Sequence, residues 1–399
     1  MKIDDKKSLK SPSLRFPEFT GEWERCKLGT LATKVGSGST PKGGDAVYTS
    51  IGHYFVRSQN VGMGFLMLDN IAHINDDIHQ KHKATEIYEN DVLLNITGAS
   101  IGRTAVATKE LEGGNVNQHV CIIRTNSKVN PKFLCDYIQT QRIQNHIKSL
   151  QTGGSREGLN FEQIRSFPIS LPSINEQNKL TCLLDKINER IATQVRLIED
   201  LKKLRCAIVE KMFKQSKANG RLGDFIEQVS VRNKNGLYSN VLSVSNKQGF
   251  VKQSEQFEDR TVASDDTSNY KIVKRNNFAY NPARINVGSI ARLTKFDVGI
   301  VSPMYVCFRT KASIIPEYME AFFTSQQFFY EMMKRLEGSV RLCLSYEGLC
   351  NIPVYIPDMN KQIAMGQNIS LILSKIGLEI EYLGRLHQQK QYLLRKMFI

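Results

Sequence analysis

The sequence predicts an α/β (α+β) fold, with two tandem mixed α/β domains separated by two long α-helices that pack as an antiparallel coiled coil. Three observations predict it. The second half of the chain repeats the first, each half mixes β-rich runs with short helical segments, and each half ends in a long apolar stripe of helical period. We expect globular domains at residues 1–174 and 215–358, and helices at residues 175–214 and 359–399.

The duplication follows a constant shift of 185 residues, which aligns residues 168–213 with residues 353–398 without a gap. Identical pairs at this shift include Pro168 and Pro353, Pro172 and Pro357, Asn175 and Asn360, Gln177 and Gln362, and Lys211-Met212-Phe213 and Lys396-Met397-Phe398. Upstream, the same shift or one residue more pairs Arg124 with Arg309, Pro131 with Pro316, Arg156 with Arg341, and Asn95 with Asn281. Because the register holds this far, the chain is two copies of one unit.

The globular part of each copy carries β-rich runs and short helical segments. Strands are expected at residues 54–57, 91–95 and 120–124, and in the second copy at residues 241–244 and 304–308. Short helices are expected at residues 131–150 and 316–336, each opening with proline in the first turn.

Each copy ends in apolar residues three or four positions apart, flanked by charges, which predicts a long amphipathic helix. A single helix of this kind could pack on the core of its own domain. Two matched stripes are better explained by the two helices packing on each other. A helix of about 36 residues is about 50 Å long, which suits a spacer between two domains with an approximate twofold relation. The residues expected to pair are Leu184, Ile187, Ile191, Val195 and Ile198, and Ile369, Ile372, Ile376, Ile380 and Leu383.

The charge balance favours a polyanionic partner. Lys and Arg number 54 against 39 Asp and Glu, a formal net charge of +15, which suits nucleic acid. No stretch approaches the roughly 20 consecutive apolar residues of a membrane helix, and the polar start is unlike a secretory signal, so we expect a cytoplasmic protein. The eight cysteines form no C-x-x-C pair, which predicts reduced core residues.

Gly- and Ser-rich loops between the strands carry the side chains that read DNA bases: Arg or Lys toward guanine, Asn or Gln toward adenine, Ser or Thr toward either. Ordinary turns have the same composition, and that alternative stays open for each residue. The candidate DNA-binding residues are Lys42, Arg57, Ser58, Gln59, Asn60, Thr97, Arg103 and Arg156 in the first copy, and Ser245, Asn246, Lys247, Arg284, Asn286 and Arg341 in the second.

No catalytic motif is present. The phosphate-binding G-x-x-x-x-G-K-[ST] loop is absent, which argues against nucleotide hydrolysis by this chain. Asn281-Pro282-Ala283-Arg284 lacks the second proline and the aromatic residue of the Asn-Pro-Pro-aromatic signature of amino-methylating enzymes. We expect a non-catalytic chain without a cofactor of its own.

The strongest metal-like cluster is His73, Asp76, Asp77, His79 and His82. A solvated helix starting near Asn75, with the aspartates in its first turn, explains these residues without a metal, and the second copy has no counterpart. We therefore expect no metal site.

The whole chain resembles the specificity subunit of type I restriction-modification systems. Three segments carry the resemblance: Leu14-Arg15-Phe16-Pro17-Glu18-Phe19 with Gly21-Glu22-Trp23, then Asp91-Val92-Leu93-Leu94-Asn95-Ile96-Thr97-Gly98, then Ile169-Ser170-Leu171-Pro172 through Asn175-Glu176-Gln177 with its second-copy echo. One departure is Lys361, where the family pattern has the glutamate seen at Glu176.

The resemblance implies a subunit that recognises an asymmetric, two-part target in double-stranded DNA. It would join two methylation subunits and then the motor-nuclease restriction subunits, with the helices setting the unread gap. S-adenosylmethionine, ATP and Mg would be used by those partners. Two other classes stay open: a stand-alone sequence-specific DNA-binding regulator and a structural coiled-coil adaptor.

Overall fold

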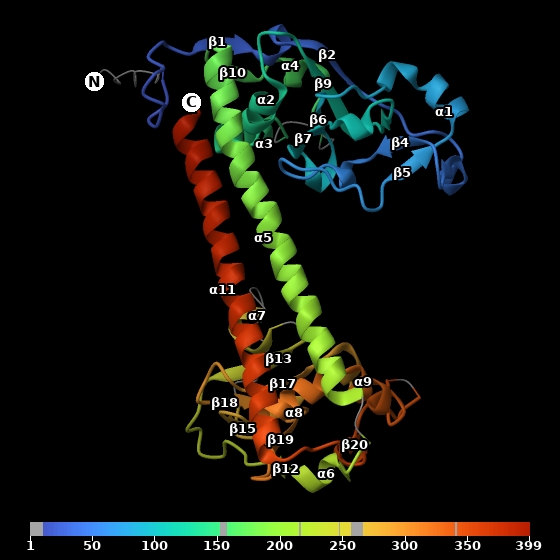
Figure 1. The fold of residues 1–399 in the computed structure, drawn as a ribbon, viewed down its shortest axis with the longest axis vertical. Helices are drawn as coiled ribbons and strands as arrows, with labels where there is room; N and C mark the ends of the chain where they lie inside the picture. Colours follow the sequence, from blue (N-terminus) through green and yellow to red (C-terminus); the bar gives the residue numbers. More distant parts are fainter. Residues whose placement is uncertain (1–10, 152–157, 215–216, 247, 257–265, 340) are drawn as a thin grey trace. The chain divides into compact units, whose positions relative to one another are not determined.

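The computed structural model describes residues 11–151, 158–214, 217–246, 248–256, 266–339 and 341–399 (Figure 1). The chain divides into two compact units. Unit 1 comprises Met1–Thr193 with Tyr382–Ile399, and unit 2 comprises Gln194–Glu381. Among the described residues, no helix combines the length and the apolar character needed to cross a membrane.

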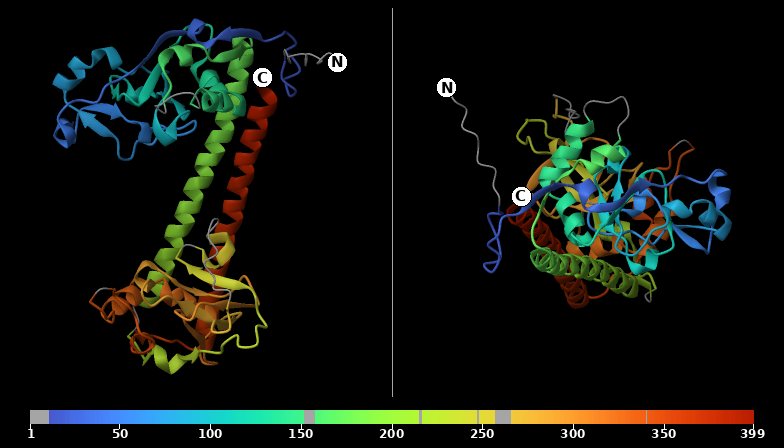
Figure 2. Two further views of the ribbon diagram at one scale, coloured as in Figure 1. Left: turned by 180° about the vertical axis from the view of Figure 1, so that it is seen from behind. Right: turned by 90° about the horizontal axis from the view of Figure 1, so that it is seen from above.

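Unit 1 contains two four-stranded sheets. Figure 2 shows the ribbon from two further sides, with the first part of the chain coloured from blue to green. The first is antiparallel, in the order β2 (Ala32–Ser37), β9 (Val120–Thr125), β6 (Val92–Asn95), β7 (Thr104–Val106). The second has the order β3 (Tyr48–Thr49), β5 (Ala72–Ile74), β4 (His53–Val56), β8 (Asn115–Val116), with β4 parallel to β8. The remaining elements are the pair β1 (Glu24–Lys27) and β10 (Pro168–Leu171), and the helices α1 (Asp76–Lys81), α2 (Pro131–Ile138), α3 (Gln141–Gln151) and α4 (Phe161–Arg165).

Unit 2 repeats the antiparallel sheet and the parallel strand pair, whereas the other strands of its mixed sheet are arranged differently. Its antiparallel sheet has the order β12 (Ile226–Val229), β19 (Val306–Thr310), β16 (Phe278–Tyr280), β17 (Ile290–Arg292). Its mixed sheet has the order β14 (Gly249–Lys252), β13 (Val241–Ser245), β18 (Val298–Val301), β15 (Lys271–Lys274), with β13 parallel to β18. The remaining elements are the pair β11 (Gly220–Arg221) and β20 (Pro353–Val354), and the helices α6 (Leu222–Phe225), α7 (Gln253–Gln256), α8 (Pro316–Phe323), α9 (Gln326–Met333) and α10 (Tyr346–Cys350).

Two glutamines show that the copies match in atomic detail. The Gln177 amide donates to the carbonyls of Lys128 (3.1 Å) and Pro172 (2.9 Å), and its oxygen accepts from the Asn130 N–H (2.8 Å). Gln362 makes the same three bonds at positions shifted by 185, to Ser313 (3.1 Å), Pro357 (2.9 Å) and Ile315 (3.0 Å). Both side chains are fully buried, so each ties the start of a long helix to its domain. The predicted duplication is confirmed.

The short helices differ from the prediction, because each expected segment forms two helices. Residues 131–150 split into α2 and α3, and residues 316–336 into α8 and α9. The second break lies at Ser325, whose hydroxyl accepts from the Phe328 N–H (3.1 Å) and caps α9. Thr140 lies at the corresponding position of the first copy, where its hydroxyl accepts from the Ile143 N–H (3.5 Å).

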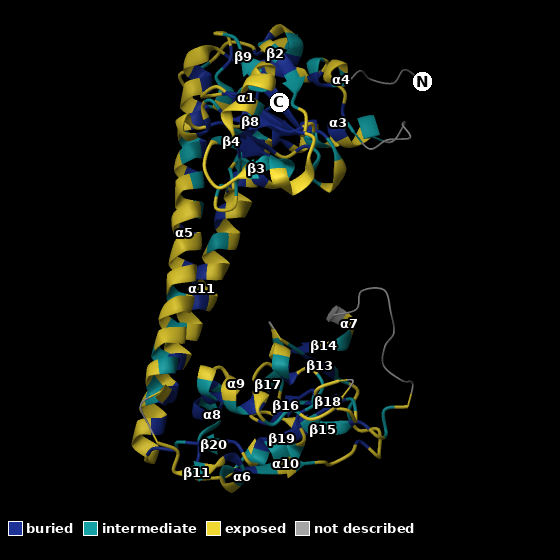
Figure 3. Cartoon of the chain, turned by 90° about the vertical axis from the view of Figure 1, so that its right-hand side faces the viewer, coloured by how far each residue is buried: buried dark blue, intermediate teal, exposed yellow. Residues whose placement is uncertain are grey.

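The two long helices are α5 (Ile174–Lys214) and α11 (Met359–Met397), and each runs through both units. In unit 1, Leu180 and Leu184 of α5 share a hydrophobic core with Leu394 and Met397 of α11. In unit 2, Val209 and Phe213 share one with Ile369. Within each unit the two segments therefore run antiparallel, and dark blue buried residues recur between yellow exposed ones along them (Figure 3).

Two of the predicted pairing residues lie outside this contact. Val195 and Ile380 are 38% and 50% exposed, so their assignment to the helix pair is wrong. The buried positions beside them are Gln194 and Glu379, which correspond at the shift of 185 and contact each other through the Gln194 amide, 3.1 Å from the Glu379 carbonyl oxygen. The apolar pattern gave wrong positions here because the faces of a straight helix rotate by about 20° per heptad relative to a strict seven-residue repeat. The buried or half-buried predicted residues are Leu184, Ile187, Ile191, Ile198, Ile369, Ile372, Ile376 and Leu383.

The end of each long helix completes the core of the domain encoded by the other copy. Phe398, at the end of α11, packs on Phe133 (ring centroids 5.4 Å apart) and Trp23 (6.3 Å) in unit 1. Phe213, at the matching end of α5, packs on Tyr318 (5.3 Å) and Phe322 (5.2 Å) in unit 2. The repeated Lys-Met-Phe sequence therefore marks two equivalent packing sites.

Glu176 explains the departure at Lys361. Its carboxylate, 2% exposed, accepts two bonds from the Arg15 guanidinium (both 2.7 Å) and one from the Trp23 indole (3.3 Å). Arg15 and Trp23 belong to the N-terminal segment of the first copy. Lys361 is exposed and pairs with Asp358 (3.3 Å). The glutamate is needed only where that segment packs.

Candidate nucleic-acid interface

A hollow of about 640 Å³ opens in unit 2 and brings together two predicted DNA-binding residues, Arg284 and Arg341. Its other lining residues come from β13, α7, the residue before β15, and the loops that follow β16 and β18: Val241, Leu242, Ser243, Gln253, Tyr270, Asn281, Ala283, Ser302, Met304 and Tyr305. We call it the unit 2 hollow. Both arginines are exposed, and neither guanidinium has a hydrogen bond or ion pair within the part of the chain that the structure describes.

The walls of the unit 2 hollow are held by internal hydrogen bonds. The Tyr305 hydroxyl accepts from the Val244 N–H (3.3 Å), and its carbonyl accepts from the Lys271 ammonium (2.6 Å). The Asn281 side-chain oxygen accepts from the Ala283 N–H (3.0 Å), which fixes the loop that presents Arg284. By contrast, the buried Oε1 of Gln253 has no partner among the described residues. The hollow thus offers two free donors and one unsatisfied acceptor.

The corresponding region of unit 1 presents a chain of neutral polar groups, which we call the unit 1 polar chain: Thr40, Gln118, His119 and Thr97. Thr40 donates to the Gln118 oxygen, and the Gln118 amide donates to His119 Nε2 (3.1 Å). His119 therefore carries its proton on Nδ1 and donates to the Thr97 hydroxyl (2.5 Å). Because the Thr97 hydroxyl accepts from His119, its own O–H is not used in this chain and can donate to a ligand.

Asn60 is not available for DNA, contrary to the prediction. It is 3% exposed, its oxygen accepts from the Arg57 N–H (3.0 Å), and its amide donates to the Met67 carbonyl (2.9 Å). It holds the turn that carries Ser58 and Gln59. Ser58 is half-buried, and its carbonyl accepts from Asn95 (2.8 Å), whereas Gln59 is exposed.

The other predicted residues lie singly on the surface. Lys42, Arg103 and Asn246 are exposed, and Arg57, Ser245 and Asn286 are half-buried. The Arg57 guanidinium lies 5.5 Å from the centre of the Tyr48 ring, and its buried Nε has no partner within the described ranges. Arg156 and Lys247 fall outside the described residues.

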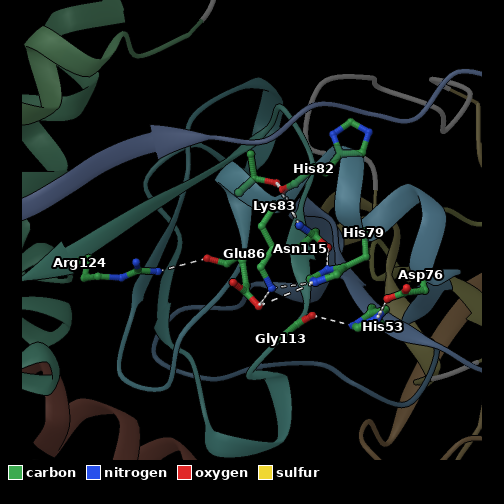
Figure 4. A network of polar contacts seen from close by, with 10 residues as sticks. His53, Asp76, His79, His82, Lys83, Glu86, Gly113, Asn115 and Arg124 are labelled. Carbon is green, nitrogen blue, oxygen red and sulfur yellow. Dashed lines mark hydrogen bonds and ion pairs between the residues drawn. The ribbon is translucent and has the colours of Figure 1, made fainter.

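The histidine and aspartate cluster of unit 1 forms a hydrogen-bonded network (Figure 4). α1 begins after Asn75, whose side chain accepts from the Ile78 N–H (2.9 Å), so the predicted helix start is confirmed. His79 donates from Nδ1 to Asn115 (2.8 Å) and stacks on His53 at 3.8 Å between ring centres. His53 in turn contacts the Gly113 carbonyl (2.9 Å) and Asp76 (3.2 Å). These contacts hold α1 against β4 and β8.

Sequence reasoning missed most of the lining of both sites. In unit 1, Gln118 and His119 lie in the polar run Asn115-Val116-Asn117-Gln118-His119 that leads into β9. In unit 2, Ser302, Met304 and Tyr305 occupy the matching position before β19. A polar run entering a buried strand was the available signal in the first copy, whereas the second copy has Ser302-Pro303-Met304-Tyr305 there and gave no such signal. Gln253 gave none, because its role depends on a neighbourhood set by distant strands.

Comparisons with known proteins agree on one family. Residues 20–203 match the family model described as type I restriction modification DNA specificity domain. A curated relative, the type I restriction enzyme EcoBI specificity subunit of Escherichia coli, is 24% identical over 135 residues, which cover 33% of this chain and 28% of that protein. The match thus spans little more than a quarter of the relative's length.

Two solved structures share the fold along nearly the whole chain. The S subunit of a type I restriction-modification system from M. genitalium covers 98% of this chain and 99% of its own, with 17% identity and a TM-score of 0.59. A chain from a structure on complex assembly and conformational transition of the type I R-M system covers 96% and 98%, with 14% identity and a TM-score of 0.57. These similarities confirm the predicted two-domain α/β fold with long helices.

Proposed function

We propose that the chain is the DNA sequence-specificity subunit of a type I restriction-modification complex, because residues 20–203 match the model of type I restriction modification DNA specificity domains and the second copy has the same antiparallel sheet. It recognises an asymmetric, two-part target in double-stranded DNA. It is not itself an enzyme.

One observation carries this proposal: a single scaffold, repeated, bears two different polar surfaces. Unit 1 presents the neutral polar chain of Thr40, Gln118, His119 and Thr97, and unit 2 presents the hollow with Arg284 and Arg341. Base edges are distinguished by their patterns of donors and acceptors. Two scaffolds with different patterns therefore select two different short sequences, which gives an asymmetric target.

We expect the remaining surface cations to contact phosphates, while the two polar surfaces contact bases. Lys42 and Arg103 are exposed, and the net charge of +15 favours contact with the phosphate backbone. Phosphate contacts fix the position of the protein on the duplex without selecting bases. We assign base reading to Thr97, Arg284 and Arg341, with Arg57, Ser58, Gln59, Ser245, Asn246 and Asn286 beside them.

We propose that the chain assembles with two methylation subunits and with motor-nuclease subunits. S-adenosylmethionine, ATP and Mg are then used by the partners. α5 and α11 would set the gap between the half-targets. The matching hydrogen bonds of Gln177 and Gln362 show that the two copies are equivalent at the starts of the long helices, which supports two equivalent places for a partner.

Genome-wide mapping of methylated bases tests the proposal, in cells with and without the gene and with the partner genes present in both. We expect a two-part methylated motif only when this chain is made. A chain that binds one specific duplex tightly alone, and leaves the methylation pattern unchanged, would instead be a stand-alone regulator and would contradict the proposal.

A further inference from the structure

We infer that Arg284 and Arg341 of the unit 2 hollow read guanine in the half-target of unit 2, and that Gln253 accepts a hydrogen bond from an exocyclic amino group beside it. This inference rests on the proposed function and specifies the chemistry of one of its two reading surfaces.

The two guanidinium groups are free donors held on a fixed rim. Neither has a hydrogen bond or ion pair within the described part of the chain, although the unit contains paired arginines such as Arg292, which lies 2.9 Å from Glu320. Arg284 follows the loop fixed by Asn281, and both arginines line the same hollow. An arginine fork fits the adjacent N7 and O6 acceptors of guanine, the commonest specific contact in the major groove.

Gln253 supplies the complementary acceptor. Its Oε1 is buried and has no partner among the described residues, which costs about 1–3 kcal/mol in a folded protein. Gln253 lines the hollow and the terminal torsion of glutamine is broad, so rotation about that torsion can present the amide oxygen to a ligand in the hollow. Cytosine N4 and adenine N6 are the amino groups that the major groove offers to such an acceptor.

The surroundings favour a base edge over a phosphate alone. The buried Tyr270 and Tyr305, both 8% exposed, and the exposed Met304 line the hollow with apolar surface. The Asn281 and Ser243 side chains are also buried there. A phosphate contact needs only cations and backbone N–H groups at the surface. A recessed lining with donors on one side and an acceptor on another matches the mixed edge of a G·C pair.

The contrast with unit 1 makes the inference specific to unit 2. The first copy has Gly98 at the position of Arg284, and the unit 1 polar chain uses its donors and acceptors internally. Arg156, which corresponds to Arg341, lies outside the described residues. The guanine requirement should therefore fall in the half-target read by unit 2.

The test uses the full chain in complex with its methylation partners. Four variants are compared with the natural chain: R284A/R341A, R284K/R341K, Q253A, and K274A as a control for loss of an exposed positive charge outside the hollow. Methylome mapping gives the motif for each. Binding is then measured on duplexes in which single guanines are replaced by 7-deazaguanine, which lacks the N7 acceptor.

We expect R284A/R341A to tolerate other bases at one or more guanine positions of one half-target only, with about 10-fold or greater loss of discrimination. R284K/R341K should keep the salt dependence and weaken the guanine preference, because a lysine ammonium can reach guanine but lacks the planar fork of arginine. The natural chain should bind the 7-deazaguanine duplex about 10-fold more weakly, and R284A/R341A should show no further loss. Q253A should relax selection for C or A beside that guanine, and K274A should leave all preferences unchanged.

Uniform weakening on every duplex by R284A/R341A, with the motif intact, would overturn the inference and make the arginines phosphate contacts. The proposed function would survive that result. If no methylated motif depends on the chain in any strain, the proposed function fails and the inference with it.

Discussion

Asp136 is a buried carboxyl whose ionisation works against folding. It lies in α2, 5% exposed, where the Gln139 amide donates to it (3.2 Å) and the Lys390 ammonium of α11 reaches the Gln139 oxygen (3.0 Å). Burial raises the pKa of Asp136 to about 7, and the nearby Lys390 opposes the rise. Since desolvation outweighs the ammonium charge, the group is more easily protonated in the folded state than in the unfolded chain.

The sign of the pH dependence follows from that raised pKa. The stabilisation from holding the proton is fully present below the ordinary pKa of an aspartate and is lost as the pH rises through about 7. The loss is on the order of 4 kcal/mol across that interval, at 1.36 kcal/mol per pKa unit. Thermal melting from pH 4 to pH 8 should therefore show declining stability of the natural chain and a flatter profile for D136N. E162Q, at an exposed carboxylate, is the control, and an unchanged slope in D136N would count against the assignment.

Glu176 and Lys361 occupy corresponding positions of the two copies, so each can be replaced by the residue that the other copy carries. Glu176→Lys removes the carboxylate that holds Arg15 and Trp23, and should destabilise unit 1 by about 3–5 kcal/mol because it places an unpaired cation at a buried position beside the half-buried Arg15. Lys361→Glu, at the matching exposed position, should change stability by about 0.5 kcal/mol or less. Melting temperature and protease cleavage of residues 11–23 report the difference. Equal effects of the two substitutions would show that the N-terminal segment is not held in this way.

At the level of the residue, the sequence predicted side-chain types better than side-chain roles. Arg284 and Arg341 were identified and lie together, whereas Asn60 was misassigned because an amide that caps its own turn has the same composition signal as one that reads a base. Gln253 was missed because only the packing around α7 leaves its oxygen without a partner.

The long helices are the elements whose sequence pattern predicted most and still misplaced two residues. Ile198 is 5% exposed and Val195 is 38% exposed, although both belong to the predicted stripe. I198A should cost about 2–5 kcal/mol because it leaves a cavity in a packed contact, and V195A should cost about 0.5 kcal/mol or less. Denaturant unfolding of the full chain measures both. A larger loss of stability for V195A than for I198A would show that Val195 does pack in the helix pair, as the sequence pattern predicted.

The strands and helix starts were predictable because their signals are local. Alternating apolar residues, a proline in the first helical turn and an Asn or Ser cap act over a few positions. The breaks at Thr140 and Ser325 were not predicted, because apolar residues on both sides continued the helical period across them. Tertiary packing decided whether each hydroxyl capped a new helix or faced solvent.

For the molecule as a whole, the proposed function makes the length of α5 and α11 a determinant of target spacing. Inserting seven residues in each helix, after Gln194 and after Glu379, adds two turns and about 10 Å while keeping the same face buried. We expect the unread gap to lengthen by about three base pairs, at about 3.4 Å per pair, with both half-sequences unchanged. Methylome mapping of the variant gives the answer. Altered half-sequences with an unchanged gap would contradict a spacer role.

The first described residues lie beside the end of α11 in unit 1, and this contact has a topological consequence. The Leu14 N–H donates to the Lys396 carbonyl (2.9 Å), so the start of the described chain lies beside the end of α11. A short peptide joining Ile399 to Ser11 would close the backbone into a ring without disturbing either core. Reopening that ring just beyond Lys214 would give a circular permutant in which the second copy is translated first, every α5 and α11 contact is kept, and both domains present the same surfaces.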